Sequence, residues 1–316
     1  MTEITPRQHE KYERLIAAAK ALPPLATAVA YPCDETSLKG ALEAAEAGLI
    51  KPILVGPKDR IISVARAFSL DLSGIEIIDV PHSQAAAETA VAVVRSRKAE
   101  LLMKGSLHTD ELLSEVVKRD TGIRTGRRIS HVFVMDVPGH PHILFITDAA
   151  VNIAPDLTAK HDIIQNAIDL HVGLGLGTPK VAILSAVETV TLSIPSTIEA
   201  AALCKMADRG QITGGELDGP LAFDNAISPE AARIKGIKSP VAGQAQILVV
   251  PDLEAGNMLA KNLTFLSGAD AAGVVLGAGV PIILTSRADN VRTRMASCAV
   301  AMLLRHSQIT KQPIQI

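Results

Sequence analysis

Apolar runs of strand length alternate with alanine-rich helical stretches along most of the chain. The run at 26–31 precedes a helical pattern at 37–47, and a second apolar run follows at 51–56. Further runs of this kind lie at 75–79, 100–104, 131–136, 142–147, 180–185, 246–250 and 280–284. Strands that alternate with helices in this way predict βαβ units around a mostly parallel sheet. The predicted fold class is therefore α/β.

Two of these apolar runs break the alternation. The runs at 131–136 and 142–147 are separated only by Val-Pro-Gly-His-Pro, which is rich in turn residues. A link this short leaves no room for a crossover helix. We therefore expect an antiparallel pair here, at the crossing into a second domain.

Polar segments follow two of the later apolar runs directly. The segment 251–257 follows the run at 246–250, and 285–289 follows the run at 280–284. In open α/β sheets, ligands bind at the carboxyl ends of the strands. Within the last segment, Ser286, Arg287 and Asp289 could bind an anion, hold an oxyanion and accept a proton. A serine cap with an arginine–aspartate pair is the structural alternative.

Other polar segments also follow expected strands. Lys104-Gly-Ser-Leu-His-Thr109 precedes a predicted helix at 110–117, and its N–H groups, lysine and hydroxyls suit a phosphate or another anionic group. Asp148 and Asn152 follow the run at 142–147, and the segment 218–225 contains Asp-Gly-Pro and Asp224. Helix caps and Asx turns are the alternative explanation for these residues, and Asp-Gly-Pro is predicted to form a turn.

Two further motifs point away from cofactor binding. The glycines of Gly-Leu-Gly-Leu-Gly at 173–177 have the wrong spacing for a dinucleotide fingerprint. They also follow a predicted helix at 156–172, so they predict a helix C-terminus instead. His140 and His142 have no third ligand nearby, and we expect a turn there and no metal site.

Composition and charge exclude several classes of protein. The formal net charge of -2 and the absence of Trp argue against a nucleic-acid or anionic-membrane partner. The four arginines between 119 and 128 are expected in a solvated loop. Cys33, Cys204 and Cys298 are too few and too far apart for a disulfide framework or a zinc site. Without an apolar stretch of roughly eighteen residues, a soluble cytoplasmic protein is predicted.

Five polar segments are similar to the motifs of a known family and occur in the same order as in that family. They are 104–109, 147–152, 218–225, 251–257 and 285–289. The chain resembles the phosphate acetyltransferases and phosphate butyryltransferases, which exchange an acyl group between coenzyme A and inorganic phosphate. The resemblance covers most of the chain from about residue 100 onward. It leans toward the butyryl branch, because Ala288-Asp289 follows Ser286-Arg287 where the acetyl enzymes usually have Ser-Arg-Gly.

The resemblance implies a two-domain α/β/α architecture like that of the isocitrate and isopropylmalate dehydrogenases, with mostly parallel sheets and a cleft between the domains. On this picture residues 1–138 and 290–316 form the first α/β domain, and residues 139–289 form the second. The C-terminal helix, expected at 290–306, returns to the first domain. A homodimer is also implied.

The resemblance further implies direct acyl transfer in a ternary complex of acyl-CoA and phosphate, without a permanently bound cofactor or a metal. Arg287 would hold the phosphate, and Ser286 would donate to the oxyanion or orient the thiol. Asp289 is the nearest carboxylate for the base, because the position seven residues beyond Ser286 holds Thr293. The residues implied in binding substrate or coenzyme A are Lys104, Ser106, His108, Thr109, Asp148, Asn152, Asp224, Asp252, Asn257 and Thr285.

Two other functions remain open at this point. A dehydrogenase acting on a phosphorylated substrate, of the hydroxythreonine-phosphate type, would share the architecture but needs a nicotinamide site and usually a metal cluster. A non-catalytic module that senses acyl-CoA, like the related domain of some malic enzymes, would keep the fold without the chemistry. Thr293, in place of an acidic residue, fits that second alternative.

Overall fold

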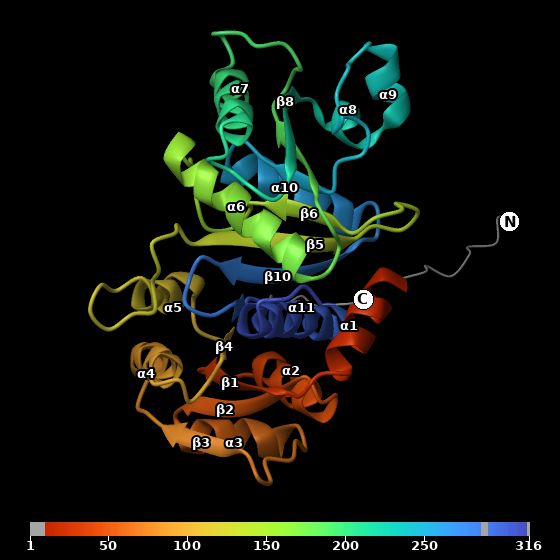
Figure 1. Ribbon diagram of the computed structural model, residues 1–316. Coiled ribbons are helices and arrows are strands. Elements are labelled where there is room, and N and C mark those ends of the chain that lie inside the picture. The colour runs from red at the N-terminus through yellow and green to blue at the C-terminus, as the bar shows by residue number, and fades with distance from the viewer. Residues whose placement is uncertain (1–9, 286–289, 315–316) are drawn as a thin grey trace, which may run out of the picture. The chain divides into compact units, whose positions relative to one another are not determined.

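The computed structural model describes residues 10–285 and 290–314 of the chain, which divides into two compact units (Figure 1). Unit 1 comprises Met1–Arg14 and Ser130–Ala271, and unit 2 comprises Leu15–Ile129 and Ala272–Ile316. Helix α1 (Glu10–Lys20) begins in unit 1 and ends in unit 2. Both units are mixed α/β with mostly parallel strands, which confirms the predicted class.

The unit bounds differ from the predicted domain bounds of 138/139 and 289/290. Strand β5 (Ser130–Asp136) pairs antiparallel with β6 (Leu144–Thr147) and therefore belongs to unit 1. Strand β11 (Ile282–Ile283) pairs with β4 (Leu101–Lys104) and therefore belongs to unit 2. The predicted assignment to domains, the likeness to the isocitrate and isopropylmalate dehydrogenases and the interdomain cleft stay predictions.

Unit 2 contains a sheet with the strand order β3-β2-β1-β4-β11-β10. Its strands are parallel except for the β10–β11 pair. Besides β4 and β11, its elements are β1 (Leu25–Ala30), α2 (Glu35–Glu46), β2 (Ile50–Gly56), α3 (Lys58–Ala67), β3 (Glu76–Asp79), α4 (Ser83–Arg95), α5 (Thr109–Val116), most of β10 (Asp270–Leu276) and α11 (Val291–Thr310).

The order of these strands creates a switch point in unit 2. The chain leaves β1 toward β2 on one side, whereas β4 lies on the other side of β1. Helix α4 connects β3 to β4 and therefore crosses back over the sheet, where it packs on β1, β2 and β4. Helix α2 packs on β2 and on α11. Ligands of open α/β sheets bind beyond the carboxyl ends of strands at such a point.

Unit 1 contains strands in the order β5-β6-β9-β7-β8, and only the β5–β6 pair is antiparallel. This pair confirms the antiparallel pairing predicted for the strands on either side of the Val-Pro-Gly-His-Pro link, and both strands lie in unit 1. Besides β5 and β6, its elements are α6 (Leu157–Gly173), β7 (Lys180–Leu184), α7 (Pro195–Asp208), β8 (Glu216–Leu221), α8 (Phe223–Ile227), α9 (Pro229–Ile234), β9 (Ile247–Val249) and α10 (Leu253–Phe265).

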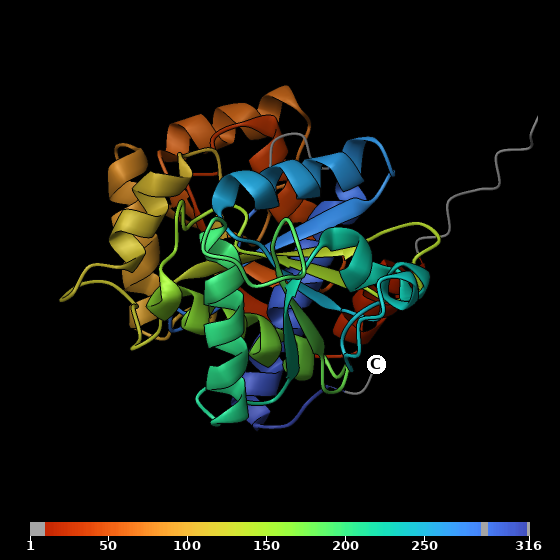
Figure 2. The same cartoon turned by 90° about the horizontal axis from the view of Figure 1, so that it is seen from above.

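The core of unit 1 lies between its strands and the helices that pack on them. Helix α6 contacts β5, β6 and β9 and lies beside α7, as the two green helices of Figure 2 show, and α10 contacts β6. Met135, Ile146, Leu184 and Leu248 are buried in one apolar cluster. The apolar side chains supply the driving force for this packing, at about 25 cal/mol per Å² of apolar surface removed from water.

Two strands were not predicted from the sequence. Strand β8 contains Asp218-Gly219-Pro220, so the prediction of a turn there was wrong. Proline is tolerated because β8 is the last strand in the order and its pairing shifts register opposite Ala182–Leu184. Strand β10 begins Asp-Ala-Ala-Gly, a composition with low β propensity.

The glycine run at 173–177 ends α6, as predicted. The N–H of Gly175 donates to the carbonyl of Val172 at 2.9 Å, and Gly175 and Gly177 have φ of 76° and 81°. Glycine adopts this left-handed conformation without the penalty that a side chain brings. No helix in the described part of the chain is long and apolar enough to span a membrane.

Candidate functional site

The loops that follow β1 and β4 are joined by hydrogen bonds at the carboxyl edge of unit 2. The N–H of Gly105 donates to the carbonyl of Ala30 at 2.9 Å, and the N–H of Ser106 donates to the carbonyl of Tyr31 at 2.8 Å. The hydroxyl of Ser106 donates to the same carbonyl at 2.9 Å and accepts from the N–H of Cys33 at 3.2 Å. Ser106 therefore fixes the β1 loop, which is a structural role in addition to any contact with a ligand.

Glycine is required at position 105. A Cβ there would lie 2.4 Å from the carbonyl oxygen of Ala30 and 2.5 Å from that of Tyr31. Tyr31 itself has φ of 55°, a left-handed conformation that costs free energy for a residue with a side chain. Strained backbone of this kind persists where the surrounding structure fixes it, and the hydrogen bonds of the β4 loop do so here.

The other predicted residues of unit 2 lie along the same edge. Lys104 ends β4 and is half-buried, and its ammonium donates to the carbonyl of Gly105 at 3.3 Å. Thr285 lies two residues beyond β11, which is parallel to β4, so both residues lie at the same edge of the sheet. His108 and Thr109 stand at the start of α5, where the N–H of His108 donates to Glu111 at 3.0 Å.

Sequence reasoning missed a cation at this edge. A guanidinium nitrogen of Arg60, in the first turn of α3, donates to the hydroxyl of Tyr31 at 2.8 Å, and the guanidinium lies 5.4 Å from the centre of the tyrosine ring. Lys104 and Arg60 thus place positive charge near the loops after β1, β2 and β4. The signal available in the sequence was the Pro-Lys-Asp-Arg segment directly after the second strand.

In unit 1, Asp148 and Asn152 form one turn after β6. The carboxylate of Asp148 is 3% exposed and accepts from the N–H groups of Ala150, Val151 and Asn152 at 2.9 to 3.2 Å. It also accepts from the side-chain amide of Asn152 at 2.6 Å. Because four donors already occupy these oxygens, the carboxylate serves as the anchor of an Asx-type turn.

The predicted residues of α10 reach the same turn. The side-chain amide of Asn257 donates to the carbonyl of Ala149 at 3.3 Å. Gly256 permits this approach, because a Cβ there would lie 2.9 Å from the Cβ of Ala149. Asp252 caps α10 by accepting from the N–H of Ala255 at 2.8 Å. Since β6 and β9 are parallel neighbours, their following loops lie together at one edge of unit 1.

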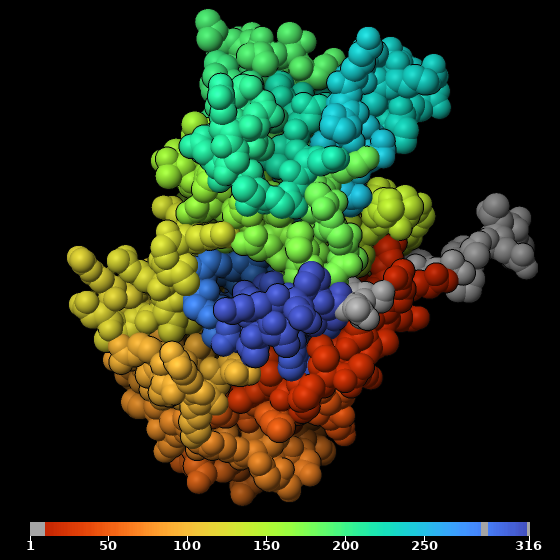
Figure 3. Space-filling model, viewed as in Figure 1, coloured from red at the N-terminus to blue at the C-terminus, as the bar shows by residue number. Residues whose placement is uncertain are grey.

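Asp224 stands apart from that group in its contacts. It lies in the short helix α8, its side chain is 57% exposed, and its carboxylate lies 4.0 Å from the ammonium of Lys235. Figure 3 shows the surface of this region in cyan, over α8 and α9. The side chain of its neighbour Asn225 points inward and donates to Glu188 at 3.2 Å.

A buried histidine lies close to Asp148 in unit 1. His131 is 1% exposed, and its ring meets that of Phe133 edge-on at 4.4 Å. Burial lowers the pKa of His131 to about 4, although the negative charge of Asp148 acts in the opposite direction. At neutral pH the ring is therefore uncharged. His131 was not predicted from the sequence as a site residue.

The three thiols are poor nucleophiles in this structure. Burial raises the pKa of Cys33 to about 11 and those of Cys204 and Cys298 to about 12. The thiolate is the reactive form of cysteine, so almost none of it exists near pH 7. A covalent intermediate on one of these cysteines is accordingly disfavoured.

Ser286, Arg287 and Asp289 lie outside the described residues. Their predicted roles stay predictions. Thr293, at the start of α11, is described: it is 4% exposed and its N–H donates to Asn290 at 2.8 Å.

Among the described residues, no group of three or more His, Cys, Asp and Glu side chains could hold a metal ion. His140 and His142 form a turn, in which a ring nitrogen of His140 lies 2.9 Å from the carbonyl oxygen of His142.

Comparisons with known proteins agree on one family. Residues 83–302 match the family described as Phosphate acetyl/butaryl transferase. The chain is 74% identical over 298 residues to a phosphate acetyltransferase of Rhizobium meliloti, with 94% of each chain covered. It is 43% identical to a phosphate butyryltransferase of Clostridium beijerinckii, over 93% of this chain and 98% of that one. A branched-chain phosphotransacylase from Enterococcus faecalis V583 has a similar fold, with a TM-score of 0.76, 29% identity and coverage of 89% and 99%.

Proposed function

Since this chain belongs to the family of phosphate acetyltransferases and phosphate butyryltransferases, we propose that it exchanges a short acyl group between coenzyme A and inorganic phosphate. The single observation that carries this function is the 74% identity to a phosphate acetyltransferase across 94% of both chains. The dehydrogenase and the non-catalytic sensing module are not favoured, because the relatives compared above are acyltransferases.

Acetyl is the acyl group that the comparisons favour. The identity is 74% to the acetyltransferase and 43% to the butyryltransferase. This preference runs against the sequence motif, because Ala288-Asp289 leans toward the butyryl branch. Overall identity samples the whole chain, whereas that motif rests on two positions, so we give the overall identity more weight.

The carboxyl edge of unit 2 suits the anionic part of a substrate. Lys104 and Arg60 supply positive charge, and the strand order places a switch point between β1 and β4. Lysine and arginine both bind phosphate, arginine through its two-pronged guanidinium. We assign the phosphate groups of coenzyme A to this edge, with His108 and Thr109 beside them at the start of α5.

The reaction we propose is a direct transfer. The sulfur of coenzyme A attacks the carbonyl carbon of the acyl phosphate, a C–S bond forms, and the bond from that carbon to the phosphate oxygen breaks. The thiol proton passes to a base, because a free thiol has a pKa near 8.5. Holding both substrates together supplies much of the acceleration. The raised thiol pKa values of the three cysteines support transfer without a cysteine-bound acyl group.

Arg287, Ser286 and Asp289 keep their proposed roles in phosphate binding, oxyanion stabilisation and proton transfer. Asp148 is a weaker choice for the base, because its oxygens already accept from four donors. Asp289→Asn is expected to lower kcat at least about a hundredfold with little change in KM, as expected for loss of general-base catalysis. Glu230→Gln, at an exposed carboxylate of α9 outside the proposed site, is the control. An unchanged kcat for Asp289→Asn would remove it from the role of base.

The experiment that tests the function is phosphate-dependent release of free thiol from acetyl-, propionyl- and butyryl-CoA by the purified protein. Release that requires phosphate and is fastest with acetyl-CoA is the expected result. Faster release from butyryl-CoA would overturn the acetyl preference but keep the reaction. No release from any of the three would overturn the reaction itself. A homodimer and a cytoplasmic location remain part of the proposal and are tested separately.

A further inference from the structure

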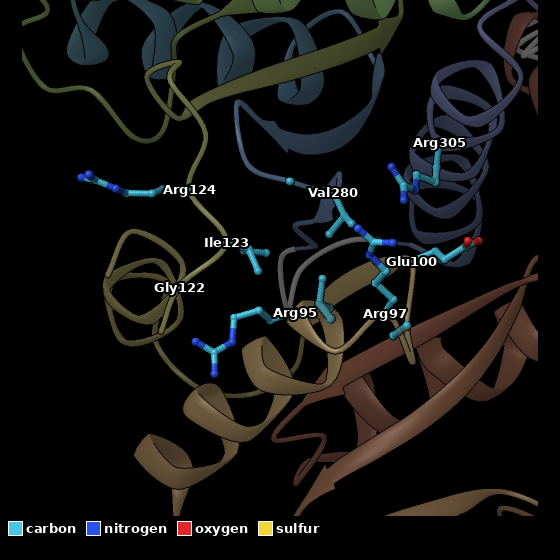
Figure 4. Close-up of a pocket in the computed structure, with 11 residues that line it drawn as sticks. Arg95, Arg97, Glu100, Gly122, Ile123, Arg124, Val280 and Arg305 are labelled. Atoms are coloured by element: carbon cyan, nitrogen blue, oxygen red, sulfur yellow. The ribbon is translucent and has the colours of Figure 1, made fainter. Parts of the chain in front are cut away.

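Unit 2 contains a cavity of about 590 Å³ at a place that the proposed reaction does not use (Figure 4). It is lined by Val94, Arg95, Arg97, Ala99, Glu100, Gly122, Ile123, Arg124, Gly279, Val280 and Arg305. Glu100 directly precedes β4, and Val280 lies two residues before β11. The cavity therefore lies at the amino ends of these parallel strands, whereas Lys104 and Thr285 lie at their carboxyl ends.

The lining of this cavity is strongly cationic. Four of the lining residues are arginines, namely Arg95, Arg97, Arg124 and Arg305, and only one, Glu100, is acidic. Within residues 10–285 and 290–314, none of the four arginines is paired with a carboxylate in a salt bridge. Arginine stays charged at any physiological pH, so this charge is permanent.

Arg97 and Arg305 extend their guanidinium groups toward the same part of the cavity (Figure 4). Figure 4 shows the guanidinium groups of Arg97 and Arg305 extending toward the region beside Val280, while Arg95 and Arg124 extend to the other side of the cavity. The Nε of Arg305 is buried, and the described residues give it no hydrogen-bond partner. A buried donor without a partner is unfavourable, so the described residues alone do not satisfy this guanidinium.

Arg97 occupies a position where glycine is usual. It follows the end of α4 with φ of 62°, and the N–H of Lys98 donates back to the carbonyl of Val93 at 3.1 Å. This is the hydrogen-bond pattern of a helix end that glycine favours. This backbone conformation is unfavourable for arginine, and it places the Arg97 side chain in the lining of the cavity.

The opposite wall of the cavity is held in place by backbone contacts. The N–H of Gly279 donates to the carbonyl of Ile123 at 2.7 Å, and Arg95 donates to the carbonyl of Asp120 at 2.7 Å. Gly122 allows a close turn, because a Cβ there would lie 2.4 Å from the carbonyl oxygen of Val116. Ile123 and Val280 give the wall an apolar surface. The cavity is thus formed before any ligand binds.

We propose that this cavity binds a small organic polyanion, a molecule with an apolar body and at least two phosphoryl or carboxylate groups, at a site separate from the carboxyl edge. The guanidinium fork matches the oxygens of either group. A volume of about 590 Å³ lies in the range of small-molecule sites, and the apolar wall contacts the body of the ligand. The inference does not depend on the proposed acyl transfer.

Calorimetric titration of the purified protein with tripolyphosphate and, separately, with citrate tests the site. Arg97→Gly removes one cation while providing the residue that the local φ of 62° favours, so this variant keeps the fold. Arg305→Gln removes the second cation. Each variant is expected to weaken binding about tenfold or more, as for the loss of a charged hydrogen bond. Arg66→Gln, at an exposed arginine of α3 outside the cavity, is the matched control and leaves binding unchanged.

Hydrogen exchange with and without tripolyphosphate locates the bound anion. Protection at 93–100, 122–124 and 279–280 is the expected result. Protection confined to 104–109, equal affinity in the wild type and both variants, or no binding of either anion at millimolar concentration would overturn the proposal. Because the readout is binding, failure of the acyl-transfer assay does not affect it.

Discussion

At the scale of single residues, Gly105 is where the β1 and β4 loops come closest. Gly105→Ala would place a Cβ 2.4 Å from the carbonyl oxygen of Ala30, so the two loops must separate. Overpacking of this kind costs roughly 1–3 kcal/mol, and we expect turnover to fall as well because Lys104 and Ser106 move. Urea denaturation and a thiol-release assay measure the two effects.

Gly126→Ala is the matched control for that substitution. No atom lies within 4 Å of a Cβ built at Gly126. The same change of side chain should therefore leave stability and turnover nearly unchanged. Equal denaturation midpoints for Gly105→Ala and the wild type would show that the loops are not in contact as described.

The lowered pKa of His171 predicts that the free energy of unfolding depends on pH. His171 is 3% exposed, and burial lowers its pKa to about 4, below the ordinary value of 6.5. The unfolded chain takes up a proton below about pH 6.5 and the folded chain does not, so stability is full above pH 6.5 and falls as pH decreases toward 4. The slope is at most about 1.4 kcal/mol per pH unit from this residue, and His131 adds to it in the same direction.

The measurement is the free energy of unfolding at several values between pH 7 and pH 4. His171→Gln lacks the titrating ring, so its dependence on pH should be shallower by up to one proton. The absolute stability of this variant does not matter, because only the slope is compared. Identical slopes for the wild type and His171→Gln would contradict the effect of burial.

Single residues also show what the sequence can reveal about a site. The predicted segments at 104–109, 148–152 and 251–257 do lie at strand ends, because a polar residue after an apolar run is visible in the sequence. His131 was not predicted, since it lies inside an apolar run and only the fold brings it to Asp148. The Arg60–Tyr31 contact joins residues 29 positions apart, which no local pattern encodes.

At the scale of elements, substitutions of Asp252 can distinguish a role in capping α10 from a role in binding substrate. Its carboxylate accepts from the N–H of Ala255 and begins α10. Asp252→Ala is expected to lower stability by about 1 kcal/mol, whereas Asp252→Asn keeps the cap and should be nearly neutral. Thermal denaturation measures this difference.

The activity of Asp252→Asn then decides whether this carboxylate does more than cap the helix. If Asp252 only caps α10, the asparagine variant keeps wild-type KM and kcat. A stable asparagine variant with a KM raised about tenfold would indicate a direct contact with substrate. Wild-type stability for Asp252→Ala would contradict the capping role.

The elements found from the sequence are those with strong periodicity. The apolar runs that were predicted as strands correspond to β1 to β7, β9 and β11. Strand β8 was missed because Asp-Gly-Pro has the composition of a turn, and only its position at the sheet edge makes a strand possible. Strand β10 was missed because three of its first four residues are alanine or glycine.

At the scale of the whole molecule, strand pairings between segments far apart in the sequence determine which segments belong to each unit. The chain returns to unit 2 near residue 272 because β11 pairs with β4, about 180 positions earlier in the sequence. Family resemblance anticipated a discontinuous first domain but placed its bounds elsewhere. Strand pairing is not visible in the pattern of a single strand, so the bounds could not be obtained from the sequence alone.

The central claim concerns the whole molecule: an acyl group passes directly between coenzyme A and phosphate. The most direct measurement is incorporation of radiolabelled inorganic phosphate into acetyl phosphate by the purified protein, with and without coenzyme A. The account predicts incorporation only when coenzyme A is present, because the acyl group must first move to sulfur and then return. Incorporation without coenzyme A would contradict direct transfer and indicate an acyl-enzyme, and no incorporation under either condition would contradict the proposed function.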